Sequence, residues 1–263
     1  MTATTEQEVN AYKLVEFFYV YPVFKSDLEK IPRDHAAIVG LLSFAVSEIN
    51  AFLRMYVFSQ HGFDHEAGIN EVIAIQNMAL MRVISAKLFE VENLLKFSKV
   101  QPPPDKMVID LAKKCLKSFD ALRRKDGYKV ALRLRNEATH HYSFAAARKS
   151  CSQISANANL NLYIHGKSGN EFYPMGEELI FAGGLNKLSG EADKNDENIY
   201  RVWFEWVKGA VLWLKSAHGR FINELILKKH PGRGARKKIF FLDETLVGEV
   251  NSTKLPVIMR FSP

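Results

Sequence analysis

Cysteine is scarce in this chain of 263 residues, which contains only Cys115 and Cys151. Two cysteines do not build a disulfide framework, so their number is typical of a reducing compartment. Apolar runs are also short: the longest, Ala36 to Val46, is interrupted by Gly40 and Ser43 and falls below the ~20 residues that span a bilayer. The polar first ten residues lack the apolar stretch of a signal peptide. We expect a cytoplasmic protein that does not associate with membranes.

Signatures of metal and cofactor chemistry are sparse as well. The chain has no Rossmann fingerprint, nucleophile elbow or Cys-x-x-Cys pair. His61 and His65 have the i, i+4 spacing of metal ligands, but flanking glycines indicate a loop and no third ligand can be identified. A surface loop is therefore the favoured interpretation, and we expect neither a metal nor a cofactor.

Acidic residues are outnumbered, and the imbalance is concentrated in two segments. The chain has 36 Lys and Arg against 29 Asp and Glu, which gives a formal net charge of +7. Segment 228–238 is rich in Lys and Arg and contains no acid, and segment 123–135 opposes its cations with Asp126 alone. One such run is ordinarily a solvated face. Two runs favour the binding of a polyanion.

Apolar residues recur at helical spacing along most of the chain. Alternating steps of three and four residues place side chains on one face of a helix. The pattern predicts five long helices, over Arg33–Gln60, Asn70–Ser98, Asp105–Arg124, Tyr128 to about Ser150, and Asn195–Lys229. The last carries Trp203, Trp206 and Trp213 on one stripe, which indicates either core packing or an interface. Asp126-Gly127 predicts a turn before the fourth. Because long helices joined by short loops form bundles, we predict a mainly α, antiparallel helical bundle.

Three shorter segments have other patterns. Tyr12 to Phe24 is dense in aromatic residues, and we expect a short first helix packed on the core. Asn159 to His165 alternates apolar and polar side chains, and Glu171 to Met175 can return beside it, which predicts a small β-hairpin insertion near 159–176. After a helix-breaking sequence at 230–234, Ile239 to Leu242 and Leu255 to Phe261 can form short strands or an arm. We therefore divide the chain into a helical domain, 1–230, and a basic C-terminal arm, 231–263.

The fourth predicted helix contains the sequence Arg135-Asn136-Glu137-Ala138-Thr139-His140-His141-Tyr142. It resembles the R-x4-6-H signature of the HEPN superfamily, in which a polar residue usually follows the arginine. His140 and His141 both satisfy the spacing, and the Arg-Asn-x-x-x-x-His-Tyr pattern of bacterial members favours His141. The resemblance implies a bundle of at least four helices, which the predicted helices supply. It also implies a metal-independent ribonuclease, as many active members are.

These residue types suit RNA cleavage without a metal. Histidine titrates near neutral pH, with a pKa of ~6.5, and can move the ribose and leaving-group protons. The arginine fork can bond two phosphate oxygens at once. Asn136 can orient a reacting group, and Tyr142 can bond a phosphate or stack on a base. We expect further RNA contacts from the two basic segments, through Lys129, Arg133, Lys237 and Lys238.

A single straight helix does not assemble this site. Arg135 and His141 are separated by a net ~120° around the axis of an ideal helix. Either Arg135 lies at a bend or a helix start, or a second subunit completes the cleft, as the HEPN resemblance implies. We therefore expect a homodimer.

Other interpretations of the same residues remain open. Arg135 can bridge acidic groups between helices, and His140 can be a core residue. The chain would then be an inactive HEPN-like scaffold that binds RNA or a protein partner. By analogy with HEPN proteins, an active enzyme would serve as a toxin, with an antitoxin as partner, or in phage defence.

Overall fold

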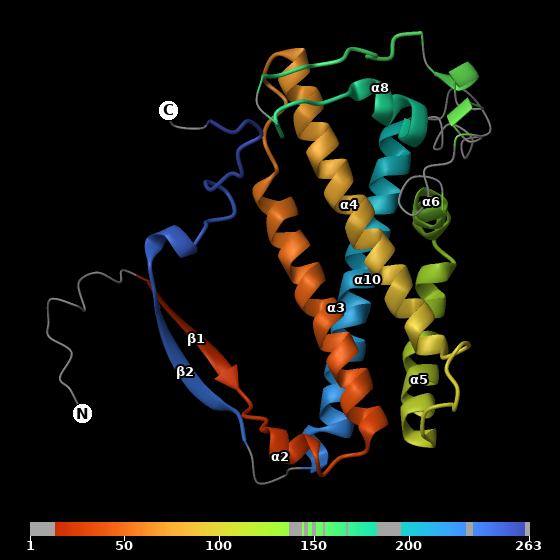
Figure 1. Cartoon of the computed structure of the whole chain (residues 1–263), viewed down its shortest axis with the longest axis vertical. Coiled ribbons are helices and arrows are strands. Elements are labelled where there is room, and N and C mark those ends of the chain that lie inside the picture. Colours follow the sequence, from red (N-terminus) through yellow and green to blue (C-terminus); the bar gives the residue numbers. More distant parts are fainter. Residues whose placement is uncertain are drawn as a thin grey trace, which may run out of the picture.

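The computed structural model describes residues 14–136, 144, 147–148, 151–154, 156–166, 168–182, 196–229 and 234–260. The protein is mainly helical, as the sequence predicts, and its long helices pack side by side (Figure 1). They are α3 (Arg33–Phe58), α4 (Ala67–Lys96), α5 (Lys106–Arg123), α6 (Asp126–Leu134) and α10 (Asp196–Leu225). Short 3₁₀ turns cover Cys151–Gln153, Leu227–Lys229 and Glu244–Leu246.

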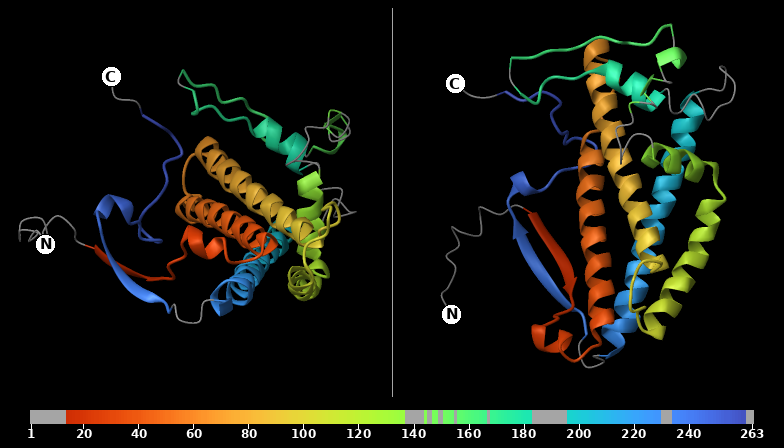
Figure 2. Two further views of the ribbon diagram at one scale, coloured as in Figure 1. Left: turned by 60° about the horizontal axis from the view of Figure 1, so that its bottom comes forward. Right: turned by 45° about the vertical axis from the view of Figure 1, so that its right-hand side comes forward.

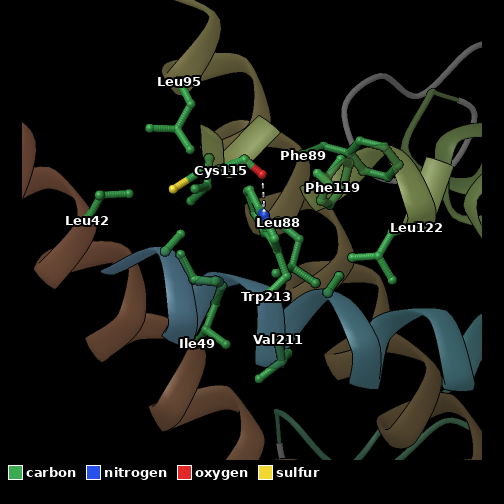
Figure 3. Close-up of a cluster of buried hydrophobic side chains, with 14 of the residues drawn as sticks. Leu42, Ile49, Leu88, Phe89, Leu95, Cys115, Phe119, Leu122, Val211 and Trp213 are labelled. Carbon is green, nitrogen blue, oxygen red and sulfur yellow. Dashed lines mark hydrogen bonds between the residues drawn. The ribbon is translucent and has the colours of Figure 1, made fainter. Parts of the chain in front are cut away.

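Helix α10 packs against each of α3, α4, α5 and α6 and therefore lies at the centre of the core. Its predicted tryptophan stripe is confirmed, because Trp203, Trp206 and Trp213 are all buried. Trp213 Nε1 donates a hydrogen bond of 2.9 Å to the carbonyl of Cys115 on α5 (Figure 3). This bond satisfies the one polar atom of a large buried ring, which would otherwise oppose burial.

Helix α6 begins at Asp126, two residues earlier than the sequence predicts. The expected turn at Asp126-Gly127 is wrong, because both residues belong to the helix and Lys125 precedes it as N-cap. Gly127 is buried, and a Cβ atom there would lie 2.1 Å from the carbonyl oxygen of Val202 on α10. Glycine at this position therefore permits close helix packing. Because glycine is also common in turns, the sequence alone did not distinguish the two roles.

In the predicted first helix, Tyr12 to Phe24, the described residues 14–24 do not form a helix packed on the core. Leu14–Val20 forms strand β1, which pairs antiparallel with β2 (Arg236–Leu242), and the short helix α2 (Lys25–Leu28) follows. The prediction failed because β-branched and aromatic residues suit a strand, while the partner strand lies at the other end of the chain. The two strands form a ribbon beside α3, in which the described side chains of β1 are exposed (Figure 2).

The predicted C-terminal arm contains one strand, β2, which includes Ile239 to Leu242. Within 255–260 no second strand forms. That segment instead folds back on the bundle, where the amide of Leu255 donates a 2.7 Å hydrogen bond to the carbonyl of Phe58 at the end of α3.

The predicted hairpin near 159–176 is reduced to a single bridge between Tyr163 and Phe172. Their backbones exchange two hydrogen bonds of 3.0 and 3.1 Å, and their rings stack with centroids 4.3 Å apart. Helix α8 (Pro174–Glu177) and a π-type turn (Glu178–Ala182) follow immediately. The alternating apolar and polar residues of this segment therefore correspond to extended chain that forms one cross-strand pair.

Helices α3 and α4 are long and apolar enough to cross a membrane by length and composition alone. This is weak evidence, because the core helices of soluble proteins pass the same test, and both helices bury part of their surface in the bundle. The 11-residue run considered in the sequence is one part of α3, which has 26 residues. A cytoplasmic location stays a prediction.

Candidate functional site

Arg135 directly follows Leu134, the last residue of α6. The backbone widens there into a π-type turn over Arg135 and Asn136, a feature that is frequent at functional sites. His140, His141 and Tyr142 lie outside the described residues, as does most of the helix predicted to continue to about Ser150.

The side chain of Arg135 packs against a buried aromatic ring of α4. Its guanidinium carbon lies 5.7 Å from the centroid of Phe89, which is 2% exposed. Phe89 in turn stacks on Trp206 of α10, with ring centroids 5.2 Å apart, and lies 5.4 Å from the ring of Tyr128. The half-buried guanidinium therefore lies over one ring, Phe89, of a larger aromatic cluster.

No ion pair or hydrogen bond neutralises Arg135 within the described ranges, and its Nε is buried without a hydrogen-bond partner. Other partly buried arginines of the bundle do have carboxylate partners: Arg123 bonds Glu92 at 2.7 Å, and Arg82 bonds Glu177 at 2.9 Å. The structure therefore shows no acidic bridge at Arg135 in the part of the chain that it describes. A buried N–H group without a hydrogen-bond partner is unfavourable, and an acceptor that reached Nε would satisfy it.

Close to Tyr128, the buried carboxylate of Glu92 binds two other cations. Glu92 is 1% exposed, and its Oε1 accepts from Lys96 at 2.9 Å and from Arg123 at 2.7 Å. Burial, with a smaller contribution from Glu92, raises the pKa of Tyr128, while Arg123 and Arg135 act in the opposite direction. The phenol of Tyr128 therefore stays protonated at neutral pH and shares the electrostatic environment of Arg135.

Two other predicted site residues lie on a different face of α6. Lys129 and Arg133 are four residues apart, so they share one side of the helix, and Asn136 follows two residues after its end. Lys129 is exposed, with a 3.6 Å ion pair to the equally exposed Asp126, and Asn136 is exposed. This polar side is about 120° away from the side that carries Tyr128 and Arg135.

Lys237 and Lys238, which the sequence predicts to contact RNA, do not lie near Arg135. Both lysines belong to β2. In Figure 1 and in both views of Figure 2 the β1–β2 ribbon flanks α3, whereas α6 lies on the other side of the bundle. The two basic segments of the sequence are therefore separate surfaces.

Sequence reasoning missed Phe89 and Tyr128. Tyr128 was recoverable, because it precedes Arg135 by seven residues and must share its face of a helix. Phe89 was not recoverable, because nothing in the spacing of α4 specifies which of its apolar residues meets α6.

The histidines considered as metal ligands lie in the loop between α3 and α4, as predicted. His61 Nε2 lies 2.6 Å from the carbonyl oxygen of Leu255 and so connects the loop to the C-terminal segment. His65 Nε2 lies 3.6 Å from a carboxylate oxygen of Asp64. No group of three or more potential metal ligands occurs in the described part of the chain.

No protein-family model, curated protein or solved structure matches this chain.

Proposed function

We propose that this protein is a metal-independent, HEPN-like endoribonuclease that acts as a homodimer. The observation that carries the proposal is Arg135, a half-buried guanidinium held on the Phe89 ring without a counterion among the described residues. A phosphate of RNA supplies the missing negative charge, and the planar fork of arginine matches two of its oxygens.

In this proposal Arg135 stabilises the charge that develops on the scissile phosphate. His141, with His140 as the alternative, takes the proton of the ribose 2′-hydroxyl and returns one to the leaving 5′-oxygen. Asn136 orients a reacting group, and Tyr142, Lys129 and Arg133 hold the RNA. The roles of the histidines and of Tyr142 rest on the sequence motif. By the same resemblance, the enzyme serves as a toxin with an antitoxin partner or in phage defence.

An inactive scaffold that binds a protein partner is the second candidate. The observation that favours it is an apolar stripe on the outer side of α3, where Leu41 and Phe44 are 51% and 63% exposed. Contiguous exposed apolar side chains commonly mark interaction surfaces. This candidate predicts a partner complex whose formation does not depend on Arg135.

The chemistry of the products tests the proposed reaction. Attack by the 2′-hydroxyl leaves a 2′,3′-cyclic phosphate or the 3′-phosphate derived from it, together with a 5′-hydroxyl. Purified protein incubated with mixed RNA in EDTA is therefore expected to produce these ends. Products with 5′-phosphate ends, or cleavage abolished by EDTA, would overturn the proposed mechanism.

A further inference from the structure

The β1–β2 ribbon presents a strongly exposed aromatic face. Directly paired residues of antiparallel strands point to the same side, so the pairs Phe17↔Ile239 and Tyr19↔Lys237 share one face with Phe241. On this face Phe17, Tyr19, Ile239 and Phe241 are 53%, 70%, 51% and 59% exposed. A two-stranded ribbon alone is marginally stable in water, and exposed apolar patches mark binding sites.

Cations accompany the rings of the ribbon. Its strands contain Arg236, Lys237 and Lys238 against one acid, Glu16. Lys237 Nζ lies 4.0 Å from the centroid of Phe17, and on the other face Lys238 Nζ lies 4.9 Å from the centroid of Phe240. Each face of this narrow ribbon therefore combines aromatic rings with positive charge.

This combination matches a single-stranded nucleic acid, because each nucleotide carries one flat base and one negative phosphate. Phe17 and Tyr19 are two residues apart on one strand, which places them roughly 7 Å apart and exposes two separate stacking surfaces. A second copy of the chain fits less well, because an isologous contact through this face would bring together the lysines of both copies.

We propose that the β1–β2 ribbon binds single-stranded RNA. Bases stack on Phe17 and Tyr19, and the cations of β2 neutralise phosphates along the ribbon. This inference rests on the proposed ribonuclease function, which identifies RNA as the polyanion. Because the ribbon and α6 lie on different sides of the bundle (Figure 2), the ribbon is a second anchoring surface for RNA and not part of the cleavage site.

The experiment measures fluorescence anisotropy of a labelled, short oligodeoxyuridylate, which lacks the 2′-hydroxyl and cannot be cleaved by the proposed chemistry. The double variant Phe17→Leu with Tyr19→Leu keeps apolar side chains on the strand but removes both rings. We expect its affinity to fall at least tenfold, given the strength of base–aromatic stacking. Phe63→Leu, at an exposed aromatic residue of the α3–α4 loop, is the matched control and is expected to bind as wild type does.

A second pair of variants tests the charges. Lys237→Gln with Lys238→Gln is expected to reduce the slope of log affinity against log salt by roughly 1.4, at ~0.7 per phosphate contact. Lys208→Gln, at an exposed position on α10, is the control for lost charge. Circular dichroism and thermal melts of every variant establish that the fold is retained.

The outcomes separate this inference from the ribonuclease proposal. Oligonucleotide binding that depends on the ribbon, in a protein that cuts no RNA, supports the ribbon site and overturns the ribonuclease. If the protein cleaves RNA but neither double variant changes its affinity for the oligonucleotide, the ribbon site alone is overturned. Ribbon-dependent binding to vesicles of anionic lipid, or ribbon-dependent self-association, without oligonucleotide binding would also overturn it.

Discussion

The guanidinium carbon of Arg135 lies 5.7 Å from the centre of the Phe89 ring, and no carboxylate of the described residues forms an ion pair with Arg135. The aromatic ring attracts the cation through its π face. A ring cannot replace a counterion, however. In the proposed ribonuclease, this positive charge would stabilise the transition-state phosphate.

The close contact between α6 and α10 predicts that replacing Gly127 by alanine destabilises the fold. Gly127→Ala places a methyl group against the Val202 carbonyl, and we expect the free energy of unfolding to fall by about 1–3 kcal/mol or more. Gly40→Ala on α3 meets nothing within 4 Å and should raise it by about 0.5–1 kcal/mol. Urea unfolding measures both, and equal effects would contradict the close packing.

The two carboxylate partners of Arg123, Glu92 and Asp120, should differ in how much they contribute to stability. Glu92→Gln leaves Arg123 and Lys96 without their shared charge, and we expect a loss of about 3 kcal/mol in the free energy of unfolding. Asp120, the other partner of Arg123, has a side chain that is 44% exposed. Asp120→Asn should therefore lower the free energy of unfolding by less than about 1 kcal/mol. A Glu92 variant as stable as the Asp120 variant would argue against the network.

A pH dependence follows from His218 on α10. Burial lowers the pKa of His218, and its Nε2 lies 2.9 Å from Ser43 Oγ on α3. The neutral imidazole is favoured in the folded state, so the unfolded chain binds the proton more readily. Stability from this group is present above about pH 6.5 and is lost as pH falls below it. Chemical unfolding between about pH 7 and pH 5 should show a shallower decline in His218→Gln, and an unchanged decline would refute the assignment.

The proposed homodimer places the two copies of α6 near its two-fold axis. Light scattering should give the mass of two chains. In a Cys151→Ser background, Asn136→Cys at the exposed end of α6 should form a disulfide-linked dimer under mild oxidation, because residues near a two-fold axis meet their own copies. Lys208→Cys on α10 is the control position. A monomer, or cross-linking at Lys208 alone, is the result that excludes a shared site.

The sequence predicted those features that depend on local periodicity. Four of the long helices, the start of the fourth predicted helix and the buried tryptophan stripe of α10 follow from steps of three and four residues, which the packing preserves. Features that depend on distant partners were missed. Strand β1 needs β2 from the other end of the chain, Gly127 needs the Val202 carbonyl, and Arg135 needs Phe89. No single segment contains that information.

The most direct test of the proposed ribonuclease compares cleavage of mixed RNA in EDTA by wild type and by single variants. Arg135→Ala should lower the rate by ~10²–10³, as loss of an oxyanion donor does. His141→Ala should lower it by ~10²–10⁴, the contribution of an acid–base group, and His140→Ala should lower it less. Arg54→Ala, at an exposed arginine of α3, should cut as wild type does. Undiminished cutting by both Arg135→Ala and His141→Ala, or no cutting by any form, would contradict the proposal.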